Sequence, residues 1–238
     1  MNKVVAASAV DAARKCAQRV LELLTDAVSK RGSATLAVSG GSTPKPMFAD
    51  LAKSGFDWTK VHLFFVDERM VPPTDDQSNY KLALENFIAP GQFPAENVHR
   101  VKGELEPDRA ARQYETELRE FFNVGRGQFP AFDVMHFGMG DEGHTASLFP
   151  GDPNIDDRKG LTAAVYAPKL PNLRVTLLPG VLLTACHSLM LVAGADKNPV
   201  LTKALKGEYH PIEIPVQIVA QAGADVVWFL DEAAAAGL

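Results

Sequence analysis

The chain has 238 residues, of which 46% are hydrophobic, and a formal net charge of −5. A chain of this length can bury a sizeable core and fits a single α/β domain over residues 1–238. Acidic and basic residues are mixed along the sequence without a broad basic patch, which argues against nucleic acid and anionic membranes as partners. No apolar run approaches the roughly 18 residues of a membrane span.

The N-terminus and the two cysteines both bear on the cellular compartment. The first residues reach Asp11 before any long apolar run develops, a pattern unlike that of a signal peptide. Cys16 and Cys186 lie far apart in apolar contexts and outside any metal-binding spacing, so we expect reduced, buried thiols. These observations predict a cytoplasmic protein.

Helical and extended periodicities alternate along the chain. In order, the pattern predicts a helix over 8–30, a strand over 34–38, a turn at 39–44 that leads into a helix, a strand over 61–66, a helix over 79–88, a strand over 98–101, a helix over 107–122, strands over 132–137, 161–166, 174–177 and 189–193, a helix to about 205, and a strand over 226–230. Apolar strands that alternate with helices indicate an α/β fold with a largely parallel sheet and helices on both faces.

Three polar segments, 39–43, 67–69 and 138–144, each follow directly after a strong strand candidate. Ligands of open parallel sheets bind beyond the carboxyl ends of the strands. The three segments are therefore expected to meet at one site.

The first segment is a glycine-rich turn that opens a helix. Gly40 and Gly41 allow close approach to the backbone, and the hydroxyls of Ser42 and Thr43 can face an anion at the helix N-terminus. No Gly-Lys-Ser/Thr sequence follows, so this is not a Walker A loop. An ordinary strand–helix turn is the alternative interpretation.

Cationic side chains near the other predicted strand ends could complete an anion site. Arg69 closes the Asp67-Glu68-Arg69 segment and could bind a phosphate or a carboxylate, although a solvated turn with local ion pairs is the alternative. Arg174 and Lys197 lie at element boundaries in otherwise apolar stretches. Taken singly, each is more often a surface charge.

The third segment contains a formal G-x-G-x-x-G and ends at His144. A nicotinamide site would need a long helix next, but Pro150-Gly151 interrupts after one or two turns. An imidazole titrates near neutral pH and can accept a proton, so His144 is better placed for acid–base chemistry. His136 lies inside an apolar strand and is predicted to be a satisfied core residue.

Two common hydrolytic motifs are missing from the sequence. There is no His-Glu-x-x-His for zinc and no G-x-S-x-G for a serine nucleophile. This leaves direct attack by water, with His144 as the general base.

Together these segments resemble the 6-phosphogluconolactonase family, which shares a superfamily with glucosamine-6-phosphate deaminases and ribose-5-phosphate isomerases. The matching stretches are Ser39-Gly40-Gly41-Ser42-Thr43-Pro44, Asp67-Glu68-Arg69, Ser78-Asn79-Tyr80, Asn97-Val98-His99-Arg100, the block 138–150, and Arg174-Val175-Thr176-Leu177. The resemblance implies a Rossmann-like fold and hydrolysis of 6-phospho-D-glucono-1,5-lactone to 6-phospho-D-gluconate in the oxidative pentose phosphate pathway, with no cofactor or metal.

The resemblance also implies roles for individual residues. His144 would activate water, and Glu142 would take the place of the Asp that the family usually has before the Gly-His pair. Glu is one methylene longer, which is expected to move the carboxylate by about 1 Å. The candidate catalytic residues are His144, Glu142 and Asp67. The candidate residues for the phosphate and the sugar are Gly40, Gly41, Ser42, Thr43, Arg69, Arg174 and Lys197.

Two other functions remain open at this point. A glucosamine-6-phosphate deaminase or sugar-phosphate isomerase would carry a ring-opening Glu at the position of Phe149 and a Tyr at that of Arg69, so these residues count against it. A non-catalytic phosphosugar-binding module is the third possibility. We expect a monomer or a weak homodimer.

Overall fold

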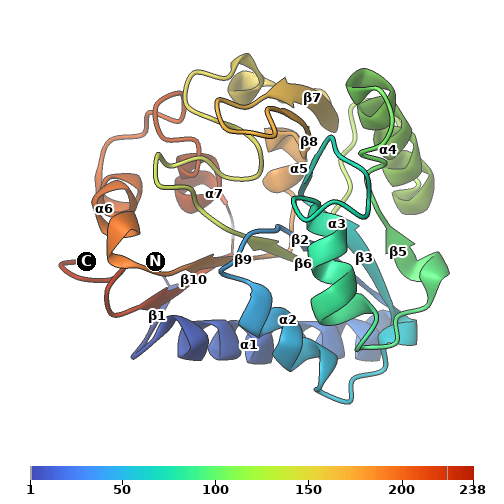
Figure 1. Cartoon of the computed structure of the whole chain (residues 1–238), viewed down its shortest axis with the longest axis horizontal. Coiled ribbons are helices and arrows are strands. Elements are labelled where there is room, and N and C mark those ends of the chain that lie inside the picture. The colour runs from blue at the N-terminus through green and yellow to red at the C-terminus, as the bar shows by residue number, and fades with distance from the viewer. Residues whose placement is uncertain (1, 224) are drawn as a thin grey trace.

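The computed structural model describes residues 2–223 and 225–238. Its centre is a sheet of seven strands that all pair in parallel, shown in Figure 1. In spatial order the strands are β1 (Asn2–Ala6), β10 (Val226–Asp231), β9 (His187–Val192), β6 (Val134–Phe137), β2 (Ala34–Val38), β3 (Val61–Phe65) and β5 (Val98–His99). The predicted α/β fold with a largely parallel sheet is confirmed.

A second, antiparallel sheet has three strands in the order β4 (Asp67–Arg69), β8 (Leu173–Leu177) and β7 (Thr162–Tyr166). Val66 joins the two sheets, because it lies between β3 and β4. Its N–H donates to the carbonyl of Val38 at 3.0 Å, and its own carbonyl accepts from the N–H of Leu177 at 2.8 Å.

Helices cover both faces of the central sheet, as predicted. Figure 1 shows α1 and α2 on one face, and the small sheet with α4, α6 and α7 on the other. The helices are α1 (Ala9–Arg31), α2 (Lys45–Ala52), α3 (Asn79–Ala83), α4 (Pro107–Phe122), α5 (Pro179–Leu182), α6 (Asn198–Lys206) and α7 (Gln217–Ala222). Short 3-10 turns cover Trp58–Lys60, Ala95–Asn97, Pro153–Asp156 and Ala195–Lys197.

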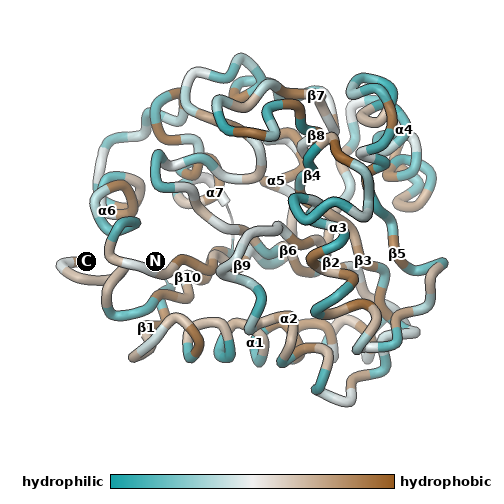
Figure 2. Tube along the Cα trace, in the orientation of Figure 1, coloured by the Kyte–Doolittle hydropathy of each residue, from teal (hydrophilic) through white to brown (hydrophobic). Residues whose placement is uncertain are grey.

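The period-two pattern of the strands divides the hydrophobic core between these two faces. In β6, Val134 packs in the cluster on the α1 side, whereas Met135 and Phe137 pack in the cluster beneath α4. Figure 2 shows the inner strands β2, β6 and β10, each of which has a neighbour on both sides, as strongly hydrophobic segments. Strands that are buried on both faces read as continuous apolar runs, which explains why the sequence revealed them.

Some elements differ from the prediction. Residues 67–69 form a strand and not a turn, and they pair with one of the two short strands predicted later in the chain. The second half of the predicted helix over 79–88 is a π-helical turn, Leu84–Ile88. Strand β1 and helix α7 were not predicted.

No helix in the described part of the chain is long and apolar enough to cross a membrane. The single-domain organisation, the cytoplasmic location and the oligomeric state stay predictions.

Candidate active site

A cavity of about 270 Å³ opens at the carboxyl ends of the central strands. It brings together the polar segments that follow β2, β3 and β6, as the fold class requires. Nine of the predicted site residues line it: Gly40, Gly41, Ser42, Thr43, Asp67, Arg69, His144, Arg174 and Lys197. The tenth, Glu142, is bonded to His144.

The glycine-rich turn and the start of α2 form one wall of this cavity. Gly41 has a φ of 101°, a backbone conformation that favours glycine. At Gly40 a Cβ would lie 1.9 Å from Oδ1 of Asn79, so only glycine fits beside this buried side chain. The unpaired N–H groups at a helix start attract anions, which gives the wall a preference for negative charge.

Two arginines lie side by side on the small sheet and face the same cavity. Arg69 of β4 and Arg174 of β8 are direct partners in the antiparallel ladder, where like charges repel. Burial lowers the pKa of Arg174, with the Asp67 charge opposing this effect and the Arg69 charge adding to it. Both guanidinium groups remain charged at physiological pH, so this arrangement favours a bound anion.

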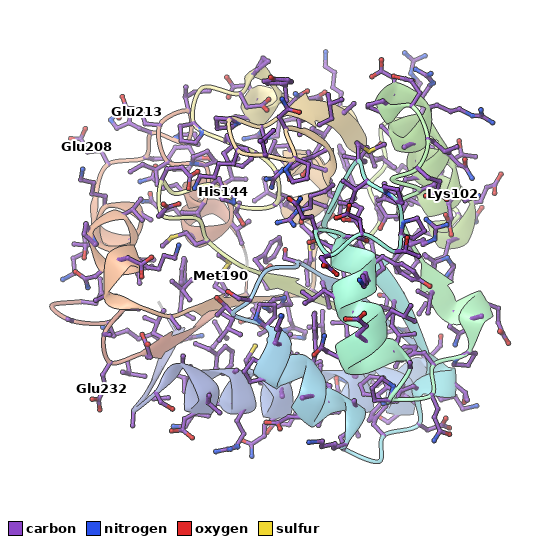
Figure 3. All side chains as sticks on the ribbon, viewed as in Figure 1. Lys102, His144, Met190, Glu208, Glu213 and Glu232 are labelled. Atoms are coloured by element: carbon purple, nitrogen blue, oxygen red, sulfur yellow. The ribbon has the colours of Figure 1, made fainter. Side chains whose placement is uncertain are left out.

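His144 lies between the central sheet and the layer that carries the small sheet (Figure 3). Its Nδ1 is 2.9 Å from Oε2 of Glu142. The other oxygen of Glu142 is 2.9 Å from Nζ of Lys169, which also binds Asp141 at 2.5 Å. The longer Glu side chain therefore reaches the histidine and is itself held by a lysine.

The pKa of Glu142 is lowered well below its ordinary value. Burial alone would raise this pKa, but hydrogen bonds from His144, from a backbone N–H and from Lys169 outweigh burial. The side chain is thus a carboxylate, which fixes the orientation of the imidazole and favours a proton on Nδ1. Nε2 is then the nitrogen that can accept a proton.

The loop that carries His144 is folded tightly against its own backbone. A Cβ at Gly140 would lie 2.0 Å from Nδ1 of His144, so glycine is needed for the close approach. The N–H of Gly140 donates to the carbonyl of His144 at 2.9 Å. The His144 ring stacks on the Phe149 ring with centroids 4.3 Å apart. The guanidinium of Arg174 lies 5.3 Å from the centroid of the Phe149 ring.

Asp67 is buried at the junction of three segments. Its Oδ2 accepts from the Ser147 hydroxyl at 2.6 Å, and its Oδ1 accepts from the Asn79 amide at 3.3 Å. Asp67 thus links strand β4, the His144 loop and the start of α3.

The described residues contain no group of three or more His, Cys, Asp or Glu side chains that could hold a metal ion.

Comparison with known proteins places the chain in a family. A family model described as glucosamine-6-phosphate isomerases/6-phosphogluconolactonase matches residues 7–228. A 6-phosphogluconolactonase from a Nostoc species is 37% identical over 220 residues, which are 92% of this chain and 90% of that protein. One from a Synechocystis species is 36% identical over 217 residues, covering 90% and 89% of the two chains. The chain belongs to the glucosamine-6-phosphate isomerase/6-phosphogluconolactonase family.

A solved member of this family has the same fold. The crystal structure of 6-phosphogluconolactonase from Thermotoga maritima aligns over 97% of this chain and 99% of that chain, with a TM-score of 0.84 and 28% sequence identity. The predicted family, that of the 6-phosphogluconolactonases, and the predicted fold class are both confirmed.

Three cavity residues of this family member were not in the predicted site. Lys169 comes from the connection between β7 and β8, which carries no motif. Asn79 was matched only as part of the family resemblance. His136 was predicted to be a satisfied core residue. It is buried as predicted, but it is not satisfied, because both ring nitrogens lack a partner within the described residues while the side chain lines the cavity.

Proposed function

We propose that this protein hydrolyses 6-phospho-D-glucono-1,5-lactone to 6-phospho-D-gluconate, with His144 as the general base. The observation that carries this proposal is that His144, held by Glu142, lines the same cavity as the anion-binding turn at Ser42. A base and a phosphate site that share one small cavity suit a phosphorylated sugar ring.

The substrate's phosphate would bind between the glycine-rich turn and the cations of the cavity. The turn offers backbone N–H groups and the hydroxyls of Ser42 and Thr43. Arg69, Arg174 and Lys197 add positive charge from the small sheet and from the segment before α6. Anchoring the phosphate at this end holds the lactone carbonyl near His144.

The chemical step needs one water molecule and no covalent intermediate. Nε2 of His144 takes a proton from water as the water oxygen attacks C1 of the lactone. The negative charge of Glu142 stabilises the imidazolium that forms. Backbone N–H groups of the 138–144 loop or a cavity cation stabilise the oxyanion. The C1–O5 bond then breaks, and O5 takes the proton from the imidazolium, giving 6-phosphogluconate.

The test compares lactone hydrolysis above the spontaneous background for wild type and His144→Ala. General base catalysis contributes about 10²–10⁴-fold, so the variant should lose about that factor in kcat with its fold intact. His62→Ala is the matched control. His62 lies at the start of strand β3, away from the carboxyl ends of the strands where the cavity opens, so this variant should keep wild-type kcat. A fully active His144→Ala would reject the assignment.

The same preparation can test the sister activity of the family. Phe149 stacks on His144 and carries no group that exchanges a proton. We therefore expect no release of ammonia from glucosamine 6-phosphate. Ammonia release at a rate comparable to lactone hydrolysis would overturn the choice of reaction.

A further inference from the structure

Two buried polar side chains at the base of the glycine-rich turn, one on its first residue and one on the neighbouring strand β6, have no role in the site as described so far. His136 is 1% exposed and Ser39 is 6% exposed, and both line the cavity. Neither ring nitrogen of His136 nor the hydroxyl of Ser39 has a hydrogen-bond partner in the part of the chain that the structure describes.

This lack of partners separates His136 from the other histidines. His99 bridges His62 and Glu117, His187 binds Asp225, and His210 contacts Glu208. His144 binds Glu142. An unpartnered buried donor or acceptor destabilises the fold, so native proteins rarely bury one without a reason. At His136 and Ser39 the open cavity is where the missing partner can bind.

The backbone holds the two side chains together at the phosphate end of the cavity. His136 on β6 is in register with Val38 on β2, and the N–H of Ser39 donates to the carbonyl of His136 at 3.2 Å. The His136 ring lies on the α2 side of the sheet, with its centroid 6.5 Å from that of Phe48. Ser39 directly precedes Gly40, so both groups lie at the base of the turn that would bind the phosphate.

The chemistry of the pair suits an anion that is already surrounded by cations. Burial lowers the pKa of His136 to about 3, so its ring is neutral near pH 7 and offers one N–H donor. The Ser39 hydroxyl offers a second donor. Neutral donors bind phosphate oxygens without adding to the repulsion between Arg69 and Arg174.

We propose that His136 and Ser39 form the floor of the phosphate subsite, where the imidazole N–H and the hydroxyl donate to the substrate's phosphate group. They are specificity-determining residues that favour the phosphorylated lactone over its unphosphorylated counterpart. This inference rests on the proposed function for its substrate, but the phosphate-binding role can be measured without turnover.

The kinetic test uses two lactones that differ only in the phosphate. For 6-phosphogluconolactone, His136→Leu and Ser39→Ala should each lower kcat/KM by about 10-fold or more through a higher KM, because a hydrogen bond to a charged group is lost. For glucono-1,5-lactone the same variants should keep wild-type kcat/KM. Equal losses on both lactones, or no loss on either, would overturn the proposal.

Two further variants control for structural effects. His136→Gln keeps a neutral N–H donor and should recover part of the loss seen in His136→Leu. His62→Leu removes a histidine from a strand end far from the cavity and should behave as wild type on both lactones. If His136→Leu does not fold, the Ser39→Ala variant, which removes one oxygen atom, decides the question. No recovery in His136→Gln counts against the donor role.

Binding of inorganic phosphate gives the readout that does not depend on turnover. In a nitrogen-15 NMR titration of the histidine side chains, the His136 ring signals should shift as phosphate saturates the wild-type protein, and Ser39→Ala should weaken the binding. An unchanged His136 signal at saturation would refute the inference. If wild type hydrolyses neither lactone, the proposed function fails, while this titration still decides the role of His136.

Discussion

The carboxylate of Glu142 contacts both the ring of His144 and the ammonium group of Lys169. The extra methylene relative to the usual Asp is therefore accommodated in this loop. The contact supports an orienting role, because a charged partner on Nδ1 fixes the tautomer that leaves Nε2 free.

Replacing this carboxylate by an amide tests the role. Glu142→Gln keeps the size of the side chain but removes the charge that would stabilise the imidazolium, so kcat should fall about 100-fold with a small change in KM. Glu142→Asp should lose activity as well, because shortening the side chain moves the carboxylate by about 1 Å. Steady-state kinetics on the lactone measures both, and unchanged kcat in Glu142→Gln would exclude the role.

The buried His136 also makes a prediction about stability. Burial lowers its pKa to about 3 in the folded state, against an ordinary value of about 6.5 in the unfolded chain. The unfolded state thus binds more protons between these values, so this stabilisation is complete above pH 6.5 and is lost as the pH falls toward 3. Between pH 7 and pH 5 the wild type should lose about 2 kcal/mol more unfolding free energy than His136→Leu.

Urea unfolding at the two pH values measures this difference. His62→Leu serves as the comparison, because its ring is only partly buried. Parallel pH profiles of wild type and His136→Leu would contradict the predicted titration.

At the level of elements, the β7–β8 hairpin brings a lysine to the site. Lys169→Met removes the ammonium group that holds Glu142, so we expect kcat to fall about 10-fold. Exposed ion pairs contribute about 1 kcal/mol or less, so the unfolding free energy should change little. Kinetics and thermal unfolding measure the two effects. Lys159→Met, on a loop outside the cavity, is the control, and an equal loss of kcat in that variant would count against Lys169.

The local sequence determines some elements and leaves others open. Helix α4 has the predicted bounds. Pro107 suits the first turn of a helix, and in the structure Asn123 ends it in a left-handed conformation. The pairing of β4 with β8 was not predictable. The three residues of β4 pair with residues of β8 about a hundred positions later in the chain, and no local sequence pattern indicates such a long-range pairing. Strand β1 is an edge strand with mostly exposed side chains, so its pattern is weak.

The candidate site was predictable where a motif and a strand end coincide. The turn at 39–43 and the block ending at His144 both met this condition, and the fold then placed them together. Lys169 and His136 did not meet it. Whether a buried histidine has a partner depends on neighbouring strands and loops, and the sequence around His136 contains no trace of those contacts.

At the scale of the whole molecule, ligand binding should stabilise the fold. Product at about 100 times its Kd adds about 2.7 kcal/mol of unfolding free energy. For a chain of this size that raises Tm by about 5–10 °C. His144→Ala should keep this shift, because its histidine is assigned to chemistry and not to the phosphate. Arg174→Met should lose most of it, and differential scanning fluorimetry with 6-phosphogluconate measures both. If 6-phosphogluconate raised the Tm of Arg174→Met as much as that of His144→Ala, the assignment of Arg174 to the phosphate site would be wrong.

Val66, the single residue between β3 and β4, sets the spacing between the glycine-rich turn and the small sheet that carries the two arginines. Val66 bonds to Val38, one residue before the glycine-rich turn, and to Leu177 at the end of the strand that carries Arg174. The segments that we propose bind the phosphate are thus joined by short backbone links and not by flexible connections. Ligand association should accordingly be a single fast step in stopped-flow traces, with a rate that rises in proportion to concentration and shows no plateau from a slower rearrangement.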